Sequence, residues 1–113
     1  MDKKSLGRYG ENIARRHYQR LGWQVISQNY WTRYGELDLV LEKNKQILIV
    51  EVKTRTNYNF GWAEESINQK KLNNIYKAYQ KIQLEKNLPP DYQLEICIIQ
   101  ISNGQINFRC LTL

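Results

Sequence analysis

One stretch near the middle of the chain, residues 35–55, constrains the fold more than any other. Two apolar-rich segments, residues 35–42 and 46–54, flank the polar sequence Lys43-Asn44-Lys45, which is the pattern of a β-hairpin. A turn of two or four residues centred between Asn44 and Lys45 pairs residue 42 with 47, 40 with 49, 38 with 51 and 36 with 53. Because successive side chains of a strand alternate between its two faces, this register predicts one face that collects Glu36, Asp38, Glu51 and Lys53.

Asp38 and Glu51 face each other in this register, with their Cβ atoms about 5 Å apart. Two ionised carboxylates at that separation repel by about 3 kcal/mol at an effective dielectric of about 20. A raised pKa on one carboxylate, a divalent cation between the two, or Lys53 as a counter-charge can offset this repulsion. The second and third options together describe a metal-dependent phosphodiesterase site, in which Lys53 orients a water or stabilises charge on the phosphorane. The alternative is a cross-strand ion-pair cluster on a solvated face.

The composition predicts a single domain, residues 1–113, with an anionic partner. The chain has 17 Lys and Arg against 11 Asp and Glu, a net charge of +6. Nucleic acid is the expected partner rather than a membrane, since no long apolar or amphipathic anchor accompanies the charge. The N-terminal sequence has no apolar signal region, so we expect a cytoplasmic protein. Two cysteines cannot build a structural zinc site, and the single histidine, His17, falls on the apolar side of the first expected helix.

The order of the expected elements is αβββαββ. Helices are expected over residues 6–21 and 63–86, and strands over residues 23–34, 35–43, 46–54, 92–102 and 105–113. The first helix should bury a stripe formed by Gly10, Ile13, Ala14, His17 and Leu21. An irregularity is expected near Asn29, where the alternation of the first strand is imperfect. The result is an α/β fold with a mixed five-stranded sheet flanked by two main helices.

The last two strands are expected to form a hairpin around Asn103-Gly104, the strongest short hairpin signal in the chain. A two-residue turn there places Cys97 opposite Cys110. A disulfide between them is conceivable on oxidation. In a reducing cytosol we expect two small buried side chains.

Glu11 has two interpretations. It can complement the helix dipole near the N-terminus and pair with Arg15 at i+4, or it can be a third carboxylate that leans over the acidic face of the hairpin. Basic and polar residues on the helices, near the aromatic end of the first strand and just after Lys53 suit contacts with phosphates. These candidate nucleic-acid-binding residues are Arg8, Arg15, Arg16, Arg33, Arg55, Gln69, Lys70 and Lys71.

Four separated motifs resemble the YraN-like family of uncharacterised bacterial proteins, within the PD-(D/E)xK superfamily of restriction-endonuclease-like nucleases. They are Gly10-Glu11, Gly35-Glu36-Leu37-Asp38, Val50-Glu51-Val52-Lys53-Thr54-Arg55 and Phe60-Gly61. The resemblance spans nearly the whole chain and extends to archaeal Holliday junction resolvases. Leu37 stands where the superfamily has its name-giving proline.

This resemblance implies that Asp38 and Glu51 ligate Mg²⁺, with Mn²⁺ as a substitute. It also implies that Lys53 assists the attacking water and that Glu11 is a helix-borne acid at the site. Gln69 and Lys70 are further residues that it places near the site. The implied function is a Mg²⁺-dependent endonuclease that hydrolyses phosphodiester bonds in DNA, with branched DNA as a candidate substrate and a homodimer as an assembly that suits a junction.

The residues leave two alternatives open. The first is a non-catalytic nucleic-acid-binding module on a nuclease-like fold, which would bind in a salt-dependent manner without cleavage. The second is an adaptor whose charged face meets a protein partner.

Overall fold

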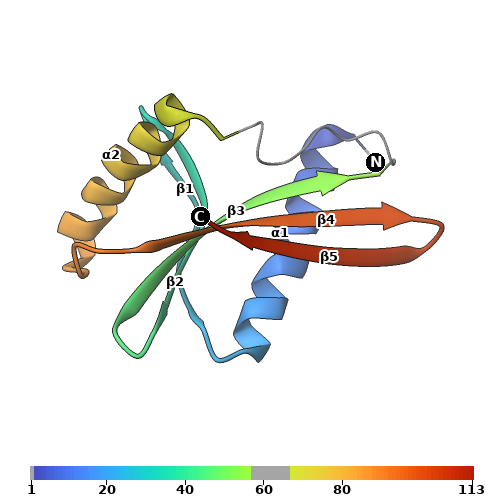
Figure 1. Ribbon diagram of the computed structural model, residues 1–113, viewed down its shortest axis with the longest axis horizontal. Coiled ribbons are helices and arrows are strands. Elements are labelled where there is room, and N and C mark those ends of the chain that lie inside the picture. Colours follow the sequence, from blue (N-terminus) through green and yellow to red (C-terminus); the bar gives the residue numbers. More distant parts are fainter. Residues whose placement is uncertain (1, 57–66) are drawn as a thin grey trace.

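A computed structural model describes residues 2–56 and 67–113 and has the expected αβββαββ order (Figure 1). Its elements are α1 (Lys3–Arg20), β1 (Gln24–Thr32), β2 (Gly35–Lys43), β3 (Gln46–Arg55), α2 (Gln69–Lys86), β4 (Gln93–Ser102) and β5 (Gln105–Thr112). The strands form one sheet in the order β1-β2-β3-β4-β5. Neighbours pair antiparallel except β3 and β4, which run parallel, so the expected mixed five-stranded α/β fold is confirmed.

Both hairpin turns are two residues long. The sequence predicts this length at Asn103-Gly104 and leaves two or four residues open at Asn44-Lys45. Lys43 pairs with Gln46, and the turn residues Asn44 and Lys45 have φ values of 51° and 64°. The second turn, Asn103-Gly104, has φ values of 49° and 75°. Positive φ at both positions matches the right-handed twist of the paired strands, and asparagine and glycine adopt it at little cost. The predicted pairs 42–47, 40–49 and 97–110 are all confirmed.

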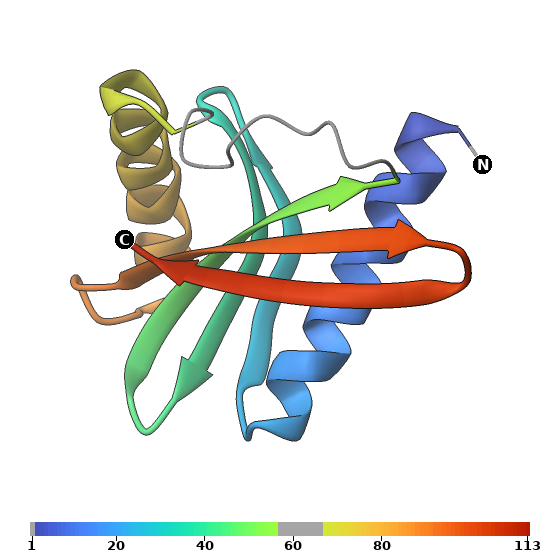
Figure 2. The same cartoon turned by 45° about the vertical axis from the view of Figure 1, so that its right-hand side comes forward.

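The two helices cover opposite faces of the sheet (Figure 2). On one face, Ala14 and Tyr18 of α1 pack over residues of the central strands that include Leu48 and Val50. On the other face, α2 packs over Ile47 and Ile49. Because β3 is buried from both sides, its sequence is continuously apolar from residue 47 to residue 50 rather than alternating. The α2 side chains in this core are Ile75, Ala78, Tyr79 and Ile82.

The buried face of α1 matches the expected stripe only in part. Gly10 and Ala14 are buried and Ile13 packs against the core, as expected, but Glu11 and Tyr18 are also buried and Leu21 is 51% exposed. Sequence periodicity missed this rotation because it assigns polar side chains outward. The Tyr18 hydroxyl has a polar partner inside, since it donates a hydrogen bond to Glu95 over 2.7 Å.

The second helix begins at Gln69, later than expected. Asn68 has extended backbone, and its side chain accepts a hydrogen bond from the Lys71 N–H over 2.8 Å. Asparagine is a strong N-cap, so Asn68 determines where the helix begins. The apolar pattern, which continues upstream, predicted an earlier start. Residues 63–66 of the expected helix, and the Phe60-Gly61 motif, lie outside the described residues.

The two cysteines are free, and their sulfur atoms lie 3.4 Å apart across β4 and β5. Cys97 is buried, as expected, but Cys110 is exposed. The expectation for Cys110 was wrong because β5 is an edge strand, which leaves one side of its residues open to solvent.

The pairing of β2 with β3 stops before either strand ends. Leu39–Val50 is the last pair of the ladder, so the predicted pairs 38–51 and 36–53 do not form. Leu37 packs in the α2 core while Leu39 packs in the α1 core, although strand residues two apart normally share a face. The strand therefore rotates between these residues and separates from β3. In Figure 2, β3 diverges from β2 toward the N-terminal half of α1.

Among the described residues, neither helix has the length and apolar character needed to cross a membrane.

Candidate functional site

A cleft of about 830 Å³ opens where β2 and β3 separate. Its charged lining, as far as the structure describes it, has two parts. Four of the described acids lie in it, all buried or half-buried: Glu11, Glu36, Asp38 and Glu51. Six basic side chains, half-buried or exposed, also line it: Lys3, Lys4, Arg8, Lys53, Arg55 and Lys71. Such a cleft offers hard oxygen ligands inside and cations for an anionic substrate around them.

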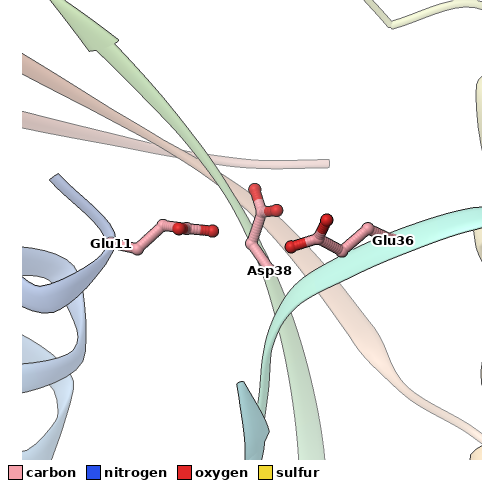
Figure 3. Close-up of side chains that lie close together, drawn as sticks. All are labelled: Glu11, Glu36 and Asp38. Atoms are coloured by element: carbon pink, nitrogen blue, oxygen red, sulfur yellow. The ribbon is translucent and has the colours of Figure 1, made fainter. Parts of the chain in front are cut away.

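Three of the acids form a compact cluster. One carboxylate oxygen each of Glu11, Glu36 and Asp38 lies within 4.8 Å of the other two. Glu11 comes from α1 and the other two from β2, and Figure 3 shows the three side chains pointing toward one another. Ionised carboxylates at this distance repel by about 3 kcal/mol per pair at an effective dielectric of about 20. The cluster therefore needs protons, hydrogen-bond donors or a cation to be stable.

Asn29 supplies hydrogen-bond donors to this cluster. Its Nδ2 lies 2.6 Å from Glu11 Oε2 and 2.6 Å from Glu36 Oε1, so one amide group donates to both carboxylates. The residue has a left-handed backbone conformation with φ of 56°, which asparagine tolerates better than most residues. The expected strand irregularity is present, but the register shift lies between Val25 and Ser27 rather than at Asn29.

Asp38 occupies the opening between the two strands. Its Oδ2 accepts a hydrogen bond from the backbone N–H of Val52 over 2.8 Å, where a regular ladder would supply a backbone carbonyl. Asp38 thus joins β2 to β3 after their pairing has ended. Its negative charge acts on both Glu11 and Glu51.

Glu51 is not one of the three clustered carboxylates, but it lies in the same cleft and its side chain shares a hydrogen bond with Asp38. Its side chain is only 3% exposed, and its Oε1 has no hydrogen-bond partner among the described residues. Burial, and then the charge of Asp38, raise the pKa of Glu51 to about 9, while Lys71 and Lys53 act in the opposite direction. Burial and Asp38 also raise the pKa of Glu11 to about 7, against the hydrogen bond from Asn29. Without an ion, the cleft therefore retains protons near neutral pH.

A close approach between α1 and β3 sets the position of Glu11. A Cβ atom added at Gly10 would lie 1.9 Å from Thr54 Oγ1 and 2.9 Å from Thr54 Cβ. Only glycine lets the helix backbone come this near to the strand. The neighbouring residue, Glu11, is thereby brought over the opening beside Asp38.

Gly10→Ala is expected to destabilise the protein by about 1–3 kcal/mol, because α1 must move away from Thr54. Urea denaturation measures the difference. Gly7→Ala is the matched control, since nothing lies within 4 Å of an added Cβ there and alanine favours the helix. Equal stability of the two variants would contradict the close packing.

The structure brings together only part of the predicted set. Glu11, Asp38, Glu51 and Lys53 all line the cleft, together with Arg8, Arg55 and Lys71. Outside its lining are Arg15, Arg16, Arg33, Gln69 and Lys70. Arg15 donates to Gln19 and Gln69 to Asn73, and Glu11 turns toward Asn29 rather than toward Arg15.

Sequence reasoning missed some residues of the site. The sequence predicts Glu36 on the acidic face but not as a metal ligand, and it indicates Asn29 only as an irregular point in a strand. Lys3 and Lys4 were overlooked because α1 begins three residues earlier than expected. The signal that could have identified Asn29 is its position in β1 between Gln28 and Tyr30, which pair with Leu39 and Leu37 on either side of Asp38.

Residues 10–101 match the profile of a family described as "Uncharacterised protein family UPF0102". A UPF0102 protein of Syntrophomonas wolfei is 37% identical over 105 residues, which cover 90% of each chain. A UPF0102 protein of Sulfurihydrogenibium sp. is 37% identical over 101 residues, 88% of each chain. A third, of Vibrio parahaemolyticus, is 32% identical over 108 residues, 94% of this chain and 89% of its own. The matched region includes all four acids of the cleft and Lys53.

Proposed function

This chain belongs to the UPF0102 family, and we propose that it is a divalent-metal-dependent endonuclease that hydrolyses phosphodiester bonds in DNA. The observation that carries the proposal is the cluster of Glu11, Glu36 and Asp38. Among the described residues, the other charged side chains that line its cleft are Glu51 and six basic residues. As part of the same proposal, we assign the αβββαββ fold to the restriction-endonuclease-like class and relate it to the Holliday junction resolvases.

The acids fit a hard divalent cation. Mg²⁺ and Mn²⁺ prefer hard oxygen ligands such as carboxylates. Glu11, Glu36 and Asp38 each offer one such oxygen, and the three oxygens lie within 4.8 Å of one another. The unpartnered Oε1 of buried Glu51 is a further oxygen in the same cleft. Glu11, Glu36, Asp38 and Glu51 would therefore hold Mg²⁺ or Mn²⁺.

A bound cation of this kind would polarise the phosphate of the substrate and activate a water molecule. The side chains of the protein supply the other catalytic groups. Lys53 lies close enough to Glu51 for its charge to act on that carboxyl, which suits an ammonium that orients the water or stabilises the phosphorane. Glu11 and Glu51 lose protons when a cation binds, so cation affinity should increase with pH.

The basic side chains around the cleft support DNA as the substrate. Arg8 and Lys4 on α1, Arg55 at the end of β3 and Lys71 on α2 approach the cleft from three elements. Contacts of this kind position a phosphate backbone without reading its sequence. Among DNA structures, we propose a branched or otherwise irregular one, on the resemblance to the resolvases.

Calorimetric titration of Mn²⁺ and Mg²⁺ tests the proposed cation site. Wild-type protein and the Asp91→Asn variant, which alters an exposed acid outside the cleft, should bind equally. Glu11→Gln and Glu36→Gln should weaken binding by at least about tenfold, since each removes one ligand and about 1.4 kcal/mol is a tenfold change. No binding by the wild type, with or without DNA, would overturn the enzyme proposal. Cleavage of linear, nicked and four-way DNA is then measured in Mg²⁺ and in chelator.

One observation favours a non-catalytic nucleic-acid-binding module as the second candidate. Asn29 already bridges Glu11 and Glu36, and raised pKa values on Glu11 and Glu51 relieve the repulsion without an ion. In that case the protein binds DNA with a steep dependence on salt, and neither Mg²⁺ nor Mn²⁺ elicits cleavage.

A further inference from the structure

A second basic surface lies at the β1–β2 turn, outside the cleft. We call Arg33, Tyr34, Lys77 and Lys81 the Tyr34 surface. The Arg33 guanidinium lies 4.8 Å from the centre of the Tyr34 ring, and its Nη2 donates to the Tyr34 hydroxyl over 2.6 Å. Lys77 Nζ of α2 lies 5.5 Å from the same ring centre. Figure 2 shows this turn beside α2.

Among the described residues, the charges that act on the Tyr34 hydroxyl are all positive. The hydrogen bond from Arg33, and then the charges of Arg33, Lys77 and Lys81, lower the pKa of Tyr34. Arg33, Lys77 and Lys81 are exposed side chains, whereas the ring between them is half-buried. Cation–π contacts at exposed sites contribute only about 0.5–1 kcal/mol, and cations that share one ring also repel one another. A bound anion would relieve this repulsion.

The Tyr34 surface adjoins the cleft. Tyr34 precedes Glu36 by two residues, which is about 7 Å of extended chain. On α2, Lys71 lines the cleft and Lys77 follows six residues later, a rise of about 9 Å along the helix. Both separations are shorter than one turn of duplex DNA, which is about 34 Å, so a duplex that lies along this side of the molecule would contact both surfaces.

We propose that duplex DNA leaving the cleft continues over the Tyr34 surface, where Arg33, Lys77 and Lys81 bind the phosphates of its backbone. The Tyr34 ring lies against Arg33 and Lys77, so it positions these cations rather than stacking on a base. The contact is thus independent of sequence. This inference rests on the proposed function, because it takes DNA as the molecule in the cleft.

Binding of a fluorescently labelled duplex of about 20 base pairs tests the inference, measured by anisotropy in chelator over a range of KCl concentrations. Lys77→Gln/Lys81→Gln removes two cations of the surface. Lys45→Gln/Lys86→Gln is the matched control, with the same loss of charge at exposed positions outside both surfaces. The first double variant should lower affinity at least tenfold relative to the control. It should also reduce the slope of log affinity against log salt by about 1.8, at about 0.9 for each lost phosphate contact.

The outcomes separate this inference from the proposed function. If the two double variants weaken binding equally, only net charge matters and the inference is wrong. A wild-type protein that fails to bind duplex DNA also overturns it. The binding measurement needs no metal and no cleavage. If the wild type cleaves no DNA but the two double variants differ in affinity as expected, the endonuclease proposal is wrong and the inference about the Tyr34 surface is supported. Arg33→Gln should reproduce about half of the change in slope.

Discussion

Asp38→Asn is expected to abolish phosphodiester cleavage while DNA binding in chelator stays equal to that of the wild type or becomes tighter. Asp38 belongs to the three-carboxylate cluster, and its charge acts on both Glu11 and Glu51. A metal centre contributes several kcal/mol to stabilisation of the transition state, so loss of this ligand should reduce the cleavage rate by about 10³-fold or more. DNA binding should not weaken, since a negative charge in the cleft is removed.

The asparagine variant should remain folded. Its side-chain oxygen can still accept the hydrogen bond that the Val52 N–H donates to Asp38 in the wild type. Gel-based cleavage of labelled DNA and anisotropy binding are measured in parallel, with Asp91→Asn as a control for the loss of one negative charge. Cleavage at the wild-type rate by Asp38→Asn would exclude the proposed mechanism.

Glu51→Gln is expected to stabilise the ion-free protein at high pH. The pKa of Glu51 is raised from 4.5 to about 9, so the folded state holds a proton that the unfolded chain releases. The stability that this proton provides is fully present below about pH 4.5 and is lost as the pH rises through about 9. Glutamine is neutral at every pH, so the variant does not lose stability in this way as the pH rises. One pKa unit corresponds to about 1.4 kcal/mol, so even a partial shift predicts a gain of about 2 kcal/mol or more at about pH 9.

Urea denaturation at about pH 5, 7 and 9 in chelator measures the difference between Glu51→Gln and the wild type. It should be small at the lowest pH and grow toward the highest. Asp91→Asn, a change at an exposed acid, should show no such growth. Saturating Mn²⁺ should stabilise the wild type and so reduce the difference in free energy of unfolding between the two proteins at high pH. A difference that is constant with pH would show that Glu51 carries no raised pKa.

The local sequence predicted the paired parts of the sheet well. Asn103-Gly104 predicts a two-residue turn, and a turn centred between Asn44 and Lys45 gives the same pairs whether it has two residues or four. Once the centre of a turn is known, every following pair is fixed while the ladder is regular. The prediction that Cys97 lies opposite Cys110 followed from the turn at Asn103-Gly104 alone. Element order followed from the same alternation of apolar segments and breakers.

The interior of the site was less accessible to prediction. Extrapolating the hairpin register to residues 38 and 51 assumed a regular ladder, but β2 rotates between Leu37 and Leu39, which pack in different cores. The acids nevertheless meet in one cleft because the strands separate around Asp38. Glu36 and Asn29 joined the cluster through that separation, which depends on tertiary packing rather than on a local pattern.

Helix boundaries were uncertain for a different reason. An apolar stripe identifies a helix but not its first residue, which capping side chains such as Asn68 decide. Burial of Glu11 could not be read from spacing, because it depends on the absence of a side chain at Gly10.

The single parallel junction of the sheet, between β3 and β4, has a consequence for the order of folding. The β1–β2–β3 meander and the β4–β5 hairpin each form from neighbouring residues, whereas Arg55 and Gln100 meet only after a long intervening segment closes. Closure of such a segment costs chain entropy before any contact compensates, so we expect docking of the two units to be the slow step. Glu11, Glu36, Asp38 and Glu51 all precede that segment. The nascent chain therefore carries these four acids before β4 is synthesised.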